Sequence, residues 1–228
     1  GNQLHNGTVY NFDEEYRPKL FRRLRNFVWE EPIHEMVRLA PVVYDSDIVI
    51  THMPEQNHAG RDLGNFRKQI AAGRRLSRRL YGMYARELFL AGNVQDLQEA
   101  ENYFRTEVSS PDRSADEITE GCCVAAKAAR LRGDTVAFFK HTSKVIAGEG
   151  CSEICCELGH FYEEKQDYEE AAVWYYNAAY ETQPTLTLRS AGEEPLQGLI
   201  RCYEQLGVPE QAESYRKELK QRQNENKK

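Results

Sequence analysis

The stretch "WEEPIHE", Trp29 to Glu35, contains the residue types best suited to acid–base chemistry. A carboxylate next to an imidazole can accept the proton of a hydroxyl group, which makes Glu35 and His34 candidate catalytic residues. The alternative is an exposed turn, because polar residues beside a proline are common in turns. A third hypothesis is a metal hydrolase site built from His34, Glu35, Asp45, Asp47 and His52. These five residues lack the spacing of a recognised metal-ligand pair.

The cysteines offer a second possible chemistry, and there are six of them: Cys122, Cys123, Cys151, Cys155, Cys156 and Cys202. Two vicinal pairs in apolar stretches such as "GCCVAAKAA" do not make a secreted disulfide framework. We therefore expect reduced core residues in a cytoplasmic protein. The alternative is a metal site at Cys151, Cys155 and Cys156, since residues four apart share a helix face, but no second ligand pair accompanies them.

Composition indicates a globular chain with an uneven charge distribution. Residues 1–80 carry 13 Lys and Arg against 10 Asp and Glu, about +3, whereas residues 81–228 carry 17 against 26, about −9. This acidic part argues against nucleic acid as a partner. No stretch approaches the ~18 apolar residues of a membrane span, and no signal-peptide core is present. The first residue is Gly rather than Met, so we expect the natural protein to begin upstream.

The elements around these residues fall into two segments. Residues 1–66 contain short apolar runs, such as "TVYNF" and "DIVIT", and four prolines, which predicts short strands and loops. Asp45-Ser46-Asp47 is expected to form a turn. Residues 67–228 have Ala, Leu, Glu and Tyr at helical spacing, so the predicted fold class is mainly α.

The helical segment contains a repeat. "ELGHFYEEKQDYEEAAVWYYNAAYETQP", residues 157–184, resembles the tetratricopeptide (TPR) pattern of two antiparallel helices. Gly159 and Ala171 let the helices approach, Tyr175 is one of the larger residues between them, and Pro184 ends the unit. Weaker units are expected at 84–104, 123–141 and 198–219, with "TLTLRSAGEEP" as a loop insertion before the last. Together they predict a superhelix of about four hairpins.

Arg67 to Leu80, "RKQIAAGRRLSRRL", is expected to form a junction helix that packs Ile70, Leu76 and Leu80 on the first repeat. Its basic residues leave a membrane-surface helix as the alternative.

A concave face of the repeats could bind a partner. In the best unit the first helix is expected to present four residues there: Glu153, Cys156, His160 and Glu163. This acidic set lacks the Lys, Arg and Asn of a clamp for peptide carboxylates. The repeats would therefore bind another protein or a second copy of the chain, or would pack against residues 1–66.

The order of motifs resembles that of a known family. "KLFRRLRNFVW", "EEPIHE", "DIVITH" and "YGMYAREL" follow one another as at the end of the catalytic domain of bacterial family 2 glycosyltransferases with C-terminal TPR repeats. The resemblance implies a GT-A fold that transfers a sugar from a nucleotide-sugar donor to an acceptor, with Mg²⁺ or Mn²⁺ at the leaving diphosphate. Residues 1–66 would then be the C-terminal part of that domain.

The resemblance also assigns roles to residues. Glu35 matches the carboxylate base, His34 shapes the same turn, and His52 matches a histidine that helps to hold the metal or diphosphate. The residues expected to bind substrates are Arg22 and Arg23, for phosphate, and Trp29, for the acceptor. The nucleotide-binding half and its Asp-x-Asp motif do not precede these motifs, so the fragment is expected to be inactive and to bind no metal. A stand-alone TPR adaptor is the alternative.

Overall fold

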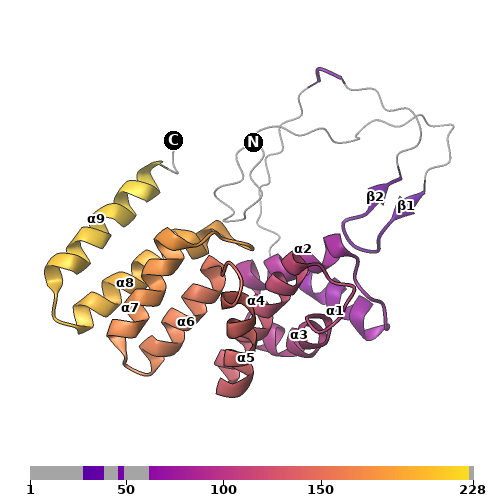
Figure 1. Cartoon of the computed structure of the whole chain (residues 1–228). Coiled ribbons are helices and arrows are strands. Elements are labelled where there is room, and N and C mark those ends of the chain that lie inside the picture. Colours follow the sequence, from indigo (N-terminus) through magenta and orange to yellow (C-terminus); the bar gives the residue numbers. More distant parts are fainter. Residues whose placement is uncertain (1–27, 39–45, 49–61, 226–228) are drawn as a thin grey trace.

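The computed structural model describes residues 28–38, 46–48 and 62–225. The sequence predictions for Arg22, Arg23, Asp45 and His52 lie outside these residues. The described part is mainly helical, with one small antiparallel sheet (Figure 1). No helix in it combines the length and the apolar composition that a membrane crossing requires.

The elements follow one another in the order β1 (Trp29–Glu30), β2 (Met36–Val37), α1 (Leu63–Ala71), α2 (Arg78–Ala91), α3 (Val94–Glu107), α4 (Ala115–Arg132), α5 (Thr135–Ile146), α6 (Ser152–Glu164), α7 (Tyr168–Tyr176), the π-helical turn η2 (Asn177–Glu181), the 3₁₀ turn η3 (Leu188–Ala191), α8 (Glu193–Gln205) and α9 (Pro209–Glu225). Three of the four predicted hairpins are present as closely packed helix pairs, α4–α5, α6–α7 and α8–α9. At the position of the other predicted hairpin, α2 and α3 both pack more closely on α4 than on each other. Figure 1 shows the pairs side by side along the chain, with β1 and β2 beside α1 and α2.

The hairpins begin and end at residues with specific local chemistry. Asn93 and Ser114 each form a capping box with the side chain three residues on, which satisfies amide groups at the starts of α3 and α4. Gly133 has a φ of 77° and ends α4, because a left-handed residue stops the helix. The Asp134 carboxylate then accepts from the amide of Ala137 and starts α5. These short turns bring consecutive helices together.

The predicted junction helix from Arg67 to Leu80 is wrong as a single element. The chain instead breaks between α1 and α2, because Gly73 has a φ of 74° and Ser77 caps the start of α2. The expected packing is nevertheless present: Leu76 and Leu80 are buried in the main core, and Ile70 packs against it.

Two aromatic-rich clusters form most of the core. The larger one extends from Ile33 through α1 to α6 and includes Leu63 and Phe66, so the expected domain boundary after residue 66 falls inside α1. The smaller one centres on Tyr175, whose ring lies between Gly159 of α6 and Gly198 of α8. A Cβ at either glycine would lie 2.6 or 2.5 Å from a ring carbon, so both positions require glycine.

A buried ionic cluster joins α2, α3 and α4. The Arg113 side chain, 4% exposed, donates to Glu107 at 2.6 Å and to Glu117 at 2.7 Å. It also donates to the carbonyl oxygen of Leu76 at 3.0 Å, and its guanidinium lies 4.2 Å from the centre of the Tyr81 ring. The Arg113 cation and the carboxylates of Glu107 and Glu117 are therefore paired away from water.

His141 predicts a measurable acid sensitivity. It is buried in α5 and its Nε2 has no hydrogen-bond partner in the described structure. Burial, aided by Lys140, Lys144 and Arg105, lowers the pKa of His141 to about 4, against a small opposing effect of Asp134. As the pH falls, His141 is protonated in the unfolded chain at a higher pH than in the folded chain. The free energy of unfolding therefore decreases as the pH drops from about 6.5 to about 4.

Urea unfolding at pH 7.5 and pH 4.5 measures this effect in the wild type and in His141→Gln. Between the two pH values, the free energy of unfolding should fall by about 2–3 kcal/mol more in the wild type than in the variant. The carboxylates contribute equally to both proteins, so the difference reports His141. An equal loss in both would contradict the assignment.

Candidate functional site

The His34-Glu35 turn lies between the two strands of the hairpin. β1 and β2 are antiparallel, with Trp29 opposite Val37 and Glu30 opposite Met36. Two non-glycine residues of the connection have positive φ, 67° at Glu31 and 50° at His34. Such backbone costs energy, so the surrounding structure must hold it in place.

The start of α2 and the main core hold this turn at several points. Ile33 is only 4% exposed and belongs to the main core. The Glu31 carboxylate accepts hydrogen bonds from the Ser77 hydroxyl and the Arg79 guanidinium. Arg79 also donates to the carbonyl oxygen of His34 at 3.2 Å. The backbone of the turn is therefore fixed to the start of α2.

The side chains of the turn remain accessible. His34 Nε2 lies 3.2 Å from a carboxylate oxygen of Asp62, which orients the ring. Glu35 is exposed and has no hydrogen bond or ion pair among the described residues. Trp29 is 63% exposed on the adjacent strand. The structure thus brings together Trp29, His34 and Glu35, and leaves the Glu35 carboxylate able to accept a proton from a docked hydroxyl group.

Sequence reasoning missed Glu31, Asp62 and Arg79, which position this turn. Glu31 and Arg79 are 48 residues apart, and no local pattern relates them. Of the expected turn at Asp45-Ser46-Asp47 the structure describes Ser46 and Asp47, where the chain bends and the Ser46 hydroxyl oxygen accepts from the amide of Ile48 at 3.0 Å.

The four residues expected on a concave face do share one face of α6, and they contact this chain itself. Glu153 is buried and accepts from the amides of Thr185, Leu186 and Thr187 at 2.7–3.1 Å. The Cys156 thiol donates to the carbonyl oxygen of Ser190 at 3.2 Å. Their polar atoms therefore bind the α7–α8 connection, which contains the predicted loop insertion.

His160 and Glu163 form a polar cluster with α7 and α8. The Tyr175 hydroxyl donates to Glu163 at 2.6 Å, and Arg201 donates to the same carboxylate at 2.6 and 2.8 Å. His160 lies 2.7 Å from the Tyr175 hydroxyl oxygen and 3.0 Å from Glu194. Hydrogen bonds from Arg201 and Tyr175 lower the pKa of Glu163 against the opposing effect of its burial. The cluster joins two successive hairpins.

The cysteines are all free and buried, as the sequence predicts. Burial raises the pKa of Cys122 and Cys155 to about 11, so these thiols stay protonated at neutral pH. The expected alternative of a metal at Cys151, Cys155 and Cys156 has no geometric support, because Cys151 instead faces Cys123 of α4 at 3.5 Å between sulfur atoms.

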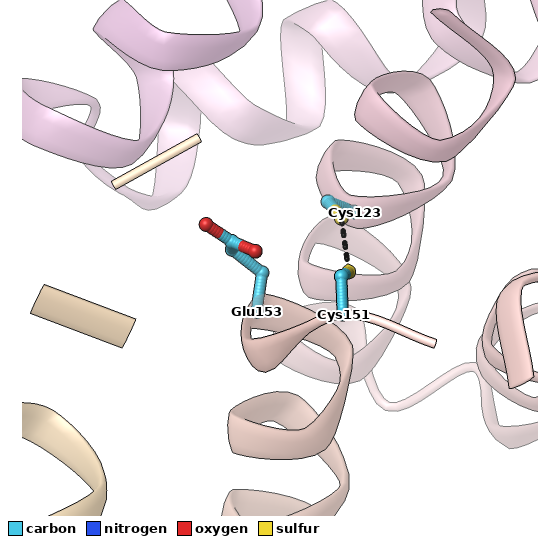
Figure 2. A group of neighbouring side chains, drawn as sticks. All are labelled: Cys123, Cys151 and Glu153. Atoms are coloured by element: carbon cyan, nitrogen blue, oxygen red, sulfur yellow. Dashed lines mark hydrogen bonds between the residues drawn. The ribbon is translucent and has the colours of Figure 1, made fainter. Parts of the chain in front are cut away.

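In the part of the chain that the structure describes, one group of three His, Cys, Asp or Glu side chains has its possible metal-ligand atoms within 4.8 Å of one another. It consists of Cys123, Cys151 and Glu153. Figure 2 shows the two sulfur atoms facing each other and the Glu153 carboxylate to one side of them. That carboxylate already accepts three amide hydrogens, so it does not fit a cation ligand.

Comparisons with protein-family models, curated proteins and solved structures gave no match for this chain.

Proposed function

We propose that the chain is the C-terminal part of a family 2 glycosyltransferase, in which residues around Glu35 complete the active site and TPR repeats dock an acceptor or partner protein. The observation that carries this proposal is the exposed Glu35 carboxylate on a turn whose backbone is held by the start of α2. A base needs a fixed backbone and an accessible carboxylate, and the turn provides both.

Further support comes from the combination of left-handed backbone and exposed aromatic surface. Strained non-glycine residues such as Glu31 and His34 cluster at functional sites more often than elsewhere. Trp29 offers an exposed ring on which a sugar or other acceptor can lie. Arg79 acts as a positioning residue, because it binds both Glu31 and the His34 carbonyl oxygen.

The donor and the cation would be held mainly by the nucleotide-binding half of the proposed parent enzyme. Mg²⁺ or Mn²⁺ would stabilise the departing diphosphate. The described residues at the turn offer one His34–Asp62 pair rather than a complete ligand set. We therefore propose that this polypeptide alone is inactive, that it binds no cation at the turn, and that the parent enzyme is cytoplasmic.

The test begins with the reading frame upstream of Gly1. An upstream segment of alternating strands and helices with an Asp-x-Asp motif would support the transferase, and a start codon directly before Asn2 would instead support a stand-alone adaptor. In the long protein, Glu35→Gln should lower release of nucleoside diphosphate from a panel of nucleotide sugars by at least about a hundredfold.

Glu30→Gln is the matched control, because Glu30 lies in the same hairpin but is paired with Arg38. Its activity should stay within about threefold of the wild type, as for loss of an exposed ion pair. Retained sugar transfer in Glu35→Gln would remove Glu35 from the mechanism.

A further inference from the structure

A groove opens on the surface where hairpin α4–α5 meets hairpin α6–α7. It is shallow and open to solvent, with a volume of about 550 Å³. Its lining comes from the end of α5 and the turn after it, from α6, and from α7 with η2, and it includes Ile146, Glu149, Cys155, Trp174, Tyr176 and Glu181. The groove is separate from the face of α6 that contains Glu153, because that face binds the α7–α8 connection.

The groove has apolar and aromatic walls that remain in contact with water. Tyr176 is 45% exposed and Ile146 is 37% exposed, and the partly buried Trp174 packs against the cluster that contains Cys155. Trp174, Asn177 and Glu181 lie three and four residues apart, so they share one face of the helix. That face continues into η2, and π-helical turns of this kind occur often at functional sites.

The charges in the groove are negative and lack partners. Glu149 and Glu181 are exposed, and neither has an ion pair or hydrogen bond within the described ranges. No Lys or Arg is among the lining residues. Some other carboxylates of the same hairpins have cationic partners, as Glu163 has Arg201 and Glu157 has Arg130. The groove offers two exposed carboxylates that a cation from another molecule can approach.

We propose that this groove docks a short segment of a partner protein that carries a lysine or arginine next to an apolar residue. The cation would lie between Glu149 and Glu181 and near the aromatic rings, which attract positive charge. The apolar neighbour would cover Ile146 and Tyr176. The proposal rests on the docking role suggested above for the repeats, and it is independent of sugar transfer.

Two synthetic peptides of nine residues test it on the whole chain. One alternates leucine with lysine and the other alternates leucine with glutamate, and fluorescence anisotropy measures their binding at about 0.15 M salt. We expect the lysine peptide to bind and the glutamate peptide not to bind. The double variant Glu149→Gln, Glu181→Gln should weaken binding about tenfold, which corresponds to two ion pairs of modest strength.

The matched control is Glu169→Gln with Glu210→Gln, which removes the same charge from two exposed positions outside the groove. Its affinity for the lysine peptide should stay within about twofold of the wild type. An equal loss in both double variants would show attraction to net charge alone and would overturn the proposal.

Two further measurements separate the other outcomes. Tyr176→Ala should weaken binding of the lysine peptide at least about threefold, and an unchanged affinity would also overturn the proposal. Sedimentation of the chain alone tests a second copy as the occupant. If the wild type forms a dimer and the variant Glu149→Gln, Glu181→Gln does not, the groove binds a second copy of the chain and the partner-protein proposal is overturned. If peptide binding fails while the long protein still transfers sugar, only the groove proposal is overturned.

Discussion

Replacing Arg113 with methionine is expected to lower the free energy of unfolding by about 3–5 kcal/mol. Methionine keeps much of the side-chain volume, but it leaves the carboxylates of Glu107 and Glu117 without their buried cation. Arg75 still reaches Glu107 at 3.0 Å, whereas Glu117 keeps only its capping hydrogen bonds at the start of α4. Urea unfolding at pH 7 measures the difference.

The control for this variant is Arg78→Met. Arg78 and its partner Asp116 are both largely exposed, and they lie 3.4 Å apart. An exposed pair of this kind contributes at most about 1 kcal/mol, so the control should be nearly as stable as the wild type. A loss below about 1 kcal/mol for Arg113→Met would mean that the cluster is not a major source of stability.

Glu153→Ala is expected to lower the free energy of unfolding by a similar amount, about 3–5 kcal/mol, for a different reason. The variant leaves the amides of Thr185, Leu186 and Thr187 without an acceptor, and a buried donor without a partner costs about 1–3 kcal/mol. Hydrogen exchange should report the change directly. In the variant, the amides of Leu186 and Thr187 should exchange much faster than in the wild type, whereas the exchange of amides in the middle of α4 should change little.

Glu153→Gln separates the roles of shape and charge, because its remaining oxygen can still accept from Leu186 and Thr187. We expect a loss of stability smaller than that of Glu153→Ala. Glu169→Ala, at an exposed position of α7, should leave both stability and exchange unchanged. If Glu153→Ala leaves Leu186 protected, the carboxylate does not hold the connection.

The hairpins were predictable because their signals are local. Apolar residues at helical spacing, capping residues such as Ser114 and a glycine such as Gly133 all act within a few residues of their own position. The pairing of Gly159 with Tyr175 also lies within one unit and could be inferred from the sequence. The contact of the same ring with Gly198 could not, because it depends on how two successive hairpins pack.

The candidate sites were predictable to a smaller extent. The sequence located Glu35, and it placed Glu153 and His160 on one face of a helix. It did not indicate that the face would be covered by the α7–α8 connection, because an insertion in a repeat gives no sign of where it folds. The groove between Glu149 and Glu181 has no sequence motif, since its walls come from four elements, α5, α6, α7 and η2.

The burial of Ile33 in the main core limits how this protein can be divided or transplanted. A version that starts at Arg67 would cut α1 and discard Leu63 and Phe66, which are fully or almost fully buried. It would also uncover the apolar side of α2. Attempts to graft these helices onto another protein should therefore carry the β1–β2 hairpin with them, because the helices and the turn they support form one structural unit.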